Sequence, residues 1–240
     1  MCGKFTRMMS WAELHDLSSL IGASSSGDGG AGEDGGGTRR DDNDQEQTTT
    51  PMRDAHVIRL NESGKREVVR MRWGWPDRWG GEPLDRPKHM HAMGETVHQK
   101  PTFAPSFRAG RRGIIAVRTF SLGEEVGKKI VQHDVTPRDG CPLGLAVIWD
   151  TVPTKEGGEV LAFVMVTTAP NALAATITDR MPAVLAPEHW AVWLGETAAP
   201  LEEVRAVLVS YPGELGMALQ PKAPPKPRGG GANPAPPPLF

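Results

Sequence analysis

The chain has 240 residues, of which 38% are hydrophobic, and a formal net charge of −2 at pH 7. This length and composition predict one domain with a substantial core, and the near-neutral charge excludes a globally basic nucleic-acid binder, so any DNA contact has to be a local patch. No apolar run approaches the roughly 20 residues that a bilayer requires. The only cysteines are Cys2 and Cys141, and with no secretory signal they predict free thiols in a reducing cytoplasm.

The first six residues, Met1-Cys2-Gly3-Lys4-Phe5-Thr6, hold the most reactive combination of groups in the chain. Methionine aminopeptidase usually removes Met1 when a small residue follows, which leaves Cys2 with a free α-amine beside its thiol. The unperturbed pKa values, about 8 for the amine and about 8.5 for the thiol, make neutral amine and thiolate accessible near neutral pH. Such a 1,2-aminothiol condenses with aldehydes to a Schiff base and then to a thiazolidine. The alternative is that Cys2 is only a small residue near a frayed terminus.

The next segments predict one helix and one long insert. Ser10-Trp11-Ala12-Glu13 has the pattern of a capping box, and the apolar spacing that follows predicts a helix to Ile21. Residues 23–50 hold seven acidic residues against two arginines and almost no apolar side chains, which predicts a disordered, acidic, Gly-rich insert. The Pro/Gly-rich residues 221–240 predict a disordered tail, so the domain spans residues 1–220.

The remaining pattern predicts strands that outnumber helices. Strands are expected at 55–60 and 66–73, joined as a hairpin, and at 113–120, 143–149 and 160–167. Short helices are expected at 171–177, 187–194 and 201–209, with Gly195 ending the second. The fold class is therefore α+β, a single domain with a curved, mainly antiparallel, barrel-like sheet and a few short helices.

Several familiar chemistries are absent from the sequence, which has no phosphate-binding loop and no nucleophile elbow. His89, His91 and His98 lie close together, but without a third defined ligand they are weak evidence for zinc, and we expect no metal and no cofactor. The stretch from Lys100 to Arg118 contains five cations and no acid. It is a candidate DNA patch, although a solvated basic face is the simpler interpretation.

Four ordered motifs carry a specific resemblance. They are Met1 to Thr6; Met71-Arg72-Trp73-Gly74-Trp75-Pro76 with Trp79; His91-Ala92-Met93-Gly94-Glu95-Thr96 followed by Lys100-Pro101-Thr102-Phe103; and Thr167-Thr168-Ala169-Pro170-Asn171 with Asp179-Arg180-Met181-Pro182. Together they resemble the SRAP family, the SOS response-associated peptidases or abasic-site processing proteins, over about Met1 to Leu194.

This resemblance implies a function in the DNA damage response. Members of the family bind single-stranded DNA, and their mature N-terminal cysteine traps the aldehyde of an abasic site as a thiazolidine crosslink. The resemblance also implies autoproteolytic removal of Met1, which is the family's peptidase activity, and a DNA lyase side reaction through the Schiff base. The expected partner is single-stranded DNA containing abasic sites, bound by a monomer that is cytoplasmic, associated with the nucleoid and independent of membranes.

The resemblance assigns Cys2 as the nucleophile and three residues to DNA binding. Lys4 stands where the family has an arginine, so it keeps the charge but loses the bidentate fork. Trp79 falls where family aromatics stack on bases, a contact of about 1–3 kcal/mol per base, although core packing is the alternative for any tryptophan. Arg180 matches the phosphate-contacting arginine, whereas Trp73 is expected in the interior.

Other catalytic positions depart from the family pattern. His91 and Met93 replace an asparagine and an arginine, Thr178 replaces a histidine, and Leu122 stands where a glutamate is expected. Glu124 is the carboxylate that a two-residue shift would bring into the pocket. His91 is then a candidate general acid/base, or it only replaces the hydrogen bond of the asparagine.

The leading hypothesis is a covalent abasic-site trap with Cys2, His91, Glu124 and Thr178 in the pocket. A non-catalytic single-stranded DNA-binding homologue is the alternative, favoured by the substitutions at His91, Leu122 and Thr178. A third hypothesis, an N-terminal-nucleophile hydrolase acting on other peptides, has no pocket signature in the sequence.

Overall fold

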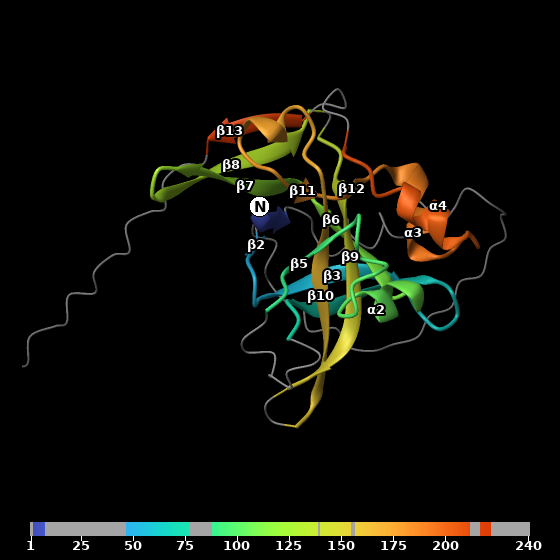
Figure 1. Cartoon of the computed structure of the whole chain (residues 1–240). Coiled ribbons are helices and arrows are strands. Elements are labelled where there is room, and N and C mark those ends of the chain that lie inside the picture. The colour runs from blue at the N-terminus through green and yellow to red at the C-terminus, as the bar shows by residue number, and fades with distance from the viewer. Residues whose placement is uncertain are drawn as a thin grey trace, which may run out of the picture.

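The computed structural model describes residues 2–7, 47–76, 88–138, 140–154, 157–211 and 217–221. Figure 1 shows two sheets with short helices at one side. The smaller sheet has the strand order β13-β8-β7-β1-β2. Its strands are β1 (Cys2–Arg7), β2 (Gln47–Thr49), β7 (Thr119–Val126), β8 (Lys129–Pro137) and β13 (Met217–Pro221).

The larger sheet closes on itself as a ring. Its strand order is β11-β10-β4-β3-β6-β9-β12, and β9 pairs with β10 as well as with β6, so the path through β10, β4, β3, β6 and β9 returns to β10. The pairings of β10 with β4 and β5 are parallel and the others are antiparallel. The bounds are β3 (Asp54–Leu60), β4 (Arg66–Trp73), β5 (His91–Met93), β6 (Arg112–Val117), β9 (Leu143–Pro153), β10 (Glu159–Thr168), β11 (Met181–Pro182) and β12 (Val184–Leu185).

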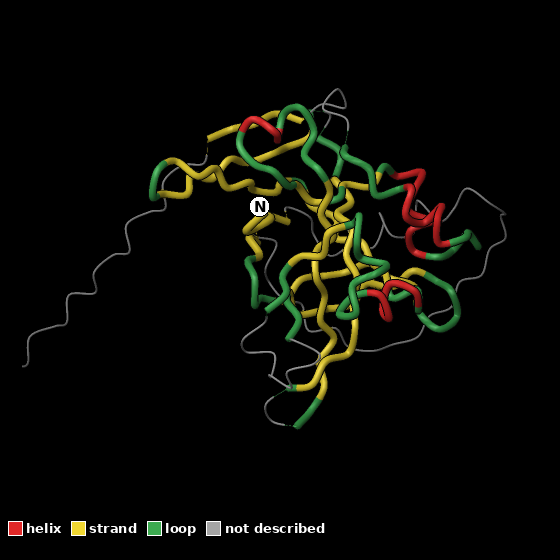
Figure 2. Tube along the Cα trace, in the orientation of Figure 1, coloured by secondary structure: helices red, strands yellow, loops and turns green. Residues whose placement is uncertain are grey.

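Helices are few and short, and strands dominate the trace in Figure 2. They are α2 (Ala104–Arg108), α3 (Trp190–Leu194) and α4 (Leu201–Ala206), with 3-10 turns η1 (Ala174–Thr176) and η2 (Pro187–His189). The predicted α+β class with a curved, mainly antiparallel sheet is therefore confirmed. Across the described ranges, no helix has both the length and the hydropathy needed to cross a membrane.

Successive residues of the ring strands supply two separate hydrophobic cores. In β6, Ile114 joins the core under the helices and Ile115 joins the core shared with β1 and β7. Phe163 and Val164 of β10 divide in the same way. Side chains alternate between the two faces of a strand, so a strand covered on both faces reads as a continuous apolar run. This explains why all six residues of β6 are buried.

The helical side of the ring is fixed by tryptophans. Trp193 of α3 donates from Nε1 to the carbonyl of Gly113 at 2.9 Å, and Trp190 donates to the carbonyl of Leu185 at 3.2 Å. A Cβ at Gly144 would lie 2.6 Å from the Trp190 ring, so only glycine fits there. Gly195 ends α3 with φ of 95°, as its position predicted.

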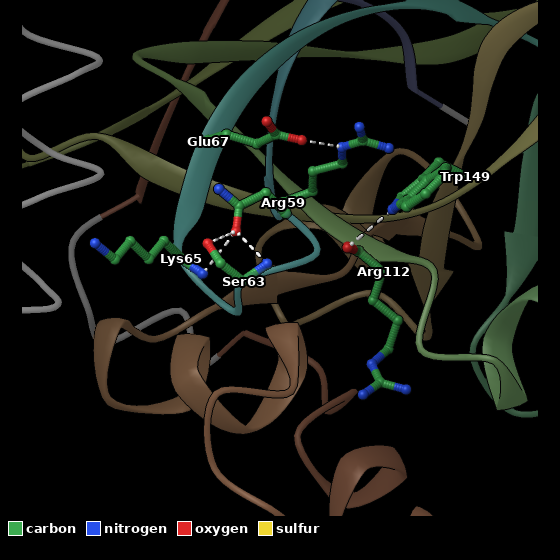
Figure 3. A network of polar contacts seen from close by, with 7 residues as sticks. Arg59, Ser63, Lys65, Glu67, Arg112 and Trp149 are labelled. Carbon is green, nitrogen blue, oxygen red and sulfur yellow. Dashed lines mark hydrogen bonds and ion pairs between the residues drawn. The ribbon is translucent and has the colours of Figure 1, made fainter.

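The turn between β3 and β4 lies far along the hairpin from Trp73. Asn61 Oδ1 accepts hydrogen bonds from the backbone of Ser63 and Lys65, each at 3.0 Å. Arg59 binds Glu67 at 2.7 Å and stacks over Trp149, with 4.4 Å from the guanidinium carbon to the ring centroid (Figure 3). Charge and ring here stabilise the outer surface of the hairpin.

Several sequence-based boundaries were wrong for identifiable reasons. The single strand predicted at 113–120 is two strands, because the chain leaves the ring at Arg118 and enters the smaller sheet as β7. The predicted insert is too long at its end, since Gln47–Thr49 forms β2 by pairing with β1. The helix predicted at 171–177 is only the 3-10 turn η1. The predicted helix at 10–21 and residues 23–46 and 222–240 lie outside the described residues.

Candidate active site around strand β1

Strand β1 holds the backbone of Cys2 inside a sheet. It pairs with β7 on one side and β2 on the other, and Cys2 lies opposite Leu122. The register shifts between Cys2 and Lys4, which is the signature of a β-bulge. Chain ends usually fray unless the sheet holds them. The backbone at Cys2 therefore has a defined position, whereas Trp79 lies outside the described residues.

Trp73 connects β1 to the segment that carries His91. The Trp73 ring is fully buried, as predicted, and its centroid lies 5.3 Å from that of Phe5 and 5.9 Å from that of His91. Trp73 Nε1 also donates to the carbonyl of Met90 at 2.9 Å. This one side chain thus packs the strand that begins at Cys2 against the start of β5.

Strand β10 aligns the other motif segments. In the parallel pairing of β5 with β10, His91 lies opposite Met165 and Met93 opposite Thr167. β11 pairs with the same end of β10, with Thr168 opposite Met181. Residues from three separate stretches of sequence therefore meet within a few positions of each other.

Arg180 binds Glu95 across this junction. Its two terminal nitrogens each donate to a Glu95 oxygen at 2.8 Å, and one of them also donates to the Thr167 carbonyl at 2.7 Å. The Arg180 side chain is 14% exposed and that of Glu95 49%. The hydrogen bonds from Arg180 lower the pKa of the Glu95 carboxyl below its ordinary value. The pair joins two motifs that the sequence separates by 85 positions.

A second acid–base pair lies on the smaller sheet. His133 Nε2 is 2.7 Å from Glu124 Oε2, and their side chains are 18% and 34% exposed. In the register of the sheet, Leu122 lies between Cys2 on β1 and His133 on β8. Glu124 is two positions beyond Leu122, so the two share a face. Since β1 and β7 are antiparallel, Glu124 lies along β7 beyond the Cys2 end of β1.

The family model described as SOS response associated peptidase (SRAP) matches residues 1–221. The chain belongs to the SRAP family. Two abasic site processing proteins of Bacillus subtilis (strain 168), YoaM and YoqW, are each 24% identical over 153 residues. That alignment covers 63% of this chain in both cases, 67% of YoaM and 68% of YoqW.

Solved structures share the SRAP fold of this chain. A protein from Bordetella bronchiseptica superposes with a TM-score of 0.68 at 22% identity, covering 92% of this chain and 100% of its own. A phage-related protein from the same organism gives 0.65 at 17% identity, covering 92% and 94%. A protein from Bacteroides thetaiotaomicron gives 0.60 at 21% identity, covering 72% and 75%.

The positions at which this SRAP chain departs from the family pattern have defined environments. Leu122, where the resemblance implies a glutamate, is fully buried in the core shared with Phe5 and Trp73. Thr178, where it implies a histidine, lies in a turn in which the Arg180 amide donates to its hydroxyl at 3.4 Å. His91 is half-buried against Trp73.

Sequence reasoning missed His133. The available signal was the hairpin itself, because Gly127 with φ of 63° lies in the turn between two segments of strand-forming residues and brings β8 beside β7. Recognising that hairpin would have placed His133 opposite Leu122. The pairing of its ring with Glu124 then follows from the diagonal contact between adjacent strands.

The cations between Lys100 and Arg118 do not form one exposed face. Arg112 is 7% exposed and donates to the carbonyls of Trp193 and Phe107, and this burial lowers its pKa. Arg111 pairs with the buried carboxylate of Asp150. Arg112 is therefore a structural cation of the helical side.

The nearby histidines have separate surroundings. His89 packs edge-on against Phe103 with 5.4 Å between centroids, and burial lowers the pKa of His98. Among the residues that the structure describes, no group of three His, Cys, Asp or Glu side chains is placed to share a metal ion.

Proposed function

We propose that this SRAP protein binds single-stranded DNA as a monomer and captures abasic sites covalently through Cys2, as the mature N-terminal residue. The observation that supports this most directly is the position of β1. Its backbone is paired on both sides, and Phe5 packs on Trp73 beside His91. A nucleophile needs this kind of fixed placement to convert an encounter into a near-unimolecular reaction.

The capture is a condensation that releases one water. The α-amine of Cys2 attacks the aldehyde carbon of the ring-opened abasic sugar, and loss of water from the carbinolamine gives a Schiff base. The thiol sulfur then bonds to the same carbon, and its proton passes to the nitrogen. The product is a five-membered thiazolidine, and no oxidant or cofactor is consumed.

Proton transfer in these steps is assigned to His91 and to Glu124. The carbinolamine needs a general acid to lose water, and imidazole exchanges protons near neutral pH. His91 reaches the site from β5, and Glu124 reaches it from β7 with His133 orienting its carboxylate. Thr178 contributes hydrogen bonds only, since a hydroxyl does not titrate in this range.

The DNA contacts are proposed for Lys4, Trp79 and Arg180. Lys4 and Arg180 would meet phosphates, and Trp79 would stack on a base without sequence preference. Processing of Met1 by the protein itself, and strand cleavage by β-elimination from the Schiff base, are further proposed activities. Both use the same amine and the same acid–base groups.

The deciding experiment uses single-stranded DNA with one abasic site and the purified protein, whose Met1 removal is checked by mass spectrometry. We expect a heat-stable shifted band with the native protein and with Cys141→Ser, since Cys141 is free and exposed. Cys2→Ser should give none. A native protein that lacks Met1, binds the oligonucleotide and forms no adduct would instead support the non-catalytic binder, which the burial of Leu122 favours.

A further inference from the structure

A polar cavity of about 560 Å³ opens between β2 and the adjoining ends of β3 and β4. Its lining consists of Arg53, Arg70, Arg72, Asp54, Met52 and the threonine run 48–50. None of these residues carries a role in the capture chemistry above. We refer to this cavity as the arginine groove.

The arginine groove has more positive than negative charge. Asp54 is its one carboxylate, and two guanidiniums share it, with Arg72 Nε at 2.5 Å and Arg70 Nε at 3.2 Å. Arg53 is exposed, and the Arg70 side chain is 72% exposed. One carboxylate neutralises one of three cations, so the groove can accept an anion. Guanidinium groups beside hydroxyls suit the oxygens of a phosphate.

The groove adjoins the strand that carries Cys2. β2 pairs with β1, Thr49 lying opposite Phe5, and because the strands are antiparallel the chain after Thr49 runs toward the Cys2 end of β1. Figure 1 shows this segment leading from beside the N-terminus to β3. The Arg53 carbonyl accepts from the Trp73 amide at 3.0 Å, and the Trp73 ring packs on Phe5.

A strained turn holds Arg53 in place. The Arg53 amide donates to the Thr50 carbonyl at 3.1 Å across a turn with Pro51 second and Met52 third. Met52 has φ of 71°, which a type II turn requires at its third residue and which normally selects glycine. Non-glycine residues held in such conformations cluster at binding sites.

We propose that the arginine groove binds a backbone phosphate of the single-stranded DNA that flanks the abasic residue at Cys2. The proposal rests on the proposed function, because it assigns the path of the strand away from the reacting sugar. Arg53 and Arg70 contact the phosphate, and Arg72 remains with Asp54.

The test measures the salt dependence of non-covalent binding with an undamaged, fluorescein-labelled single-stranded oligonucleotide. Anisotropy titrations between about 50 and 200 mM salt give the slope of log Kobs against log salt for the native protein, Arg53→Ala and Arg70→Ala. The matched control is Lys65→Ala, which removes one exposed cation at the opposite end of the same hairpin (Figure 3). Each groove variant should lose about 0.7 of slope per phosphate contact, and the control should lose none.

Groove variants with the slope of Lys65→Ala would overturn the proposal. A second arm adds inorganic phosphate or a deoxynucleoside monophosphate, which should compete only weakly because neither offers a continuous strand. Strong competition by either, abolished in Arg70→Ala with the DNA slope unchanged, would also overturn it and identify a free phosphate site. Failure of the capture chemistry appears separately, as a native protein that binds this oligonucleotide but forms no adduct with abasic DNA.

Discussion

Replacing Glu95 by glutamine releases Arg180 from its carboxylate and keeps a side chain of similar shape. A DNA phosphate that uses Arg180 has to displace Glu95, whose side chain is 49% exposed. An ion pair with an exposed partner contributes about 0.2–1 kcal/mol. If the carboxylate competes with DNA, Glu95→Gln should tighten binding of an undamaged single-stranded oligonucleotide by about 1.4- to 5-fold, the same free energy expressed as a ratio.

Glu196→Gln is the matched control, because Glu196 also binds an arginine through two oxygens and its loss changes the net charge equally. Its partner Arg66 begins β4, at the other end of the strand from Trp73. Anisotropy at low salt compares the two variants, and urea unfolding confirms that both remain folded. Equal affinity changes in the two variants, or weaker binding by Glu95→Gln, would refute the competition and make Arg180 a structural residue.

The remaining predictions concern pH, proton transfer and strain. The lowered pKa of Glu95 means that its contribution to stability is present above its unfolded pKa, about 4.3, and is lost as pH falls through the lower folded value; urea unfolding at acid pH should therefore destabilise the native protein more than Glu95→Gln. His91→Asn should slow adduct formation by about 100-fold, and Thr178→His in that background should restore part of the rate; an unchanged pH–rate profile would exclude His91 as the proton carrier. Met52→Val should unfold with a free energy at least about 1 kcal/mol below that of Met52→Gly, because a β-branched residue does not tolerate φ of 71°.

Local pattern was sufficient for the ring hairpin and insufficient for partners that lie far apart in sequence. Strand 66–73 was predicted with the bounds it has, because apolar and polar residues alternate between two turn signals. Arg112 reads as one cation in a basic run, and its burial depends on Trp193, 81 positions later. No periodicity encodes that contact.

The candidate site shows the same division. The four motifs identify the family and bring His91 and Arg180 to one end of β10, but they do not indicate that Arg180 binds Glu95. The partner of Glu124 was missed because the β7–β8 hairpin was not recognised, and side-chain pairs across strands follow only once the register is known.

Strand β10, on which the motif segments align, has a consequence for the timing of folding. Residues 159–168 are synthesised after Cys2, Trp73 and His91, and β1 itself waits for its partner Leu122. Contacts between residues so distant in sequence form slowly, because loop closure costs entropy before any contact is made. During translation the N-terminal segment therefore emerges as an unpaired strand, accessible to any enzyme that processes nascent chains. Maturation of Cys2 and assembly of its surroundings are in this way separate events, the first open to the ribosome exit and the second dependent on the late arrival of a single strand.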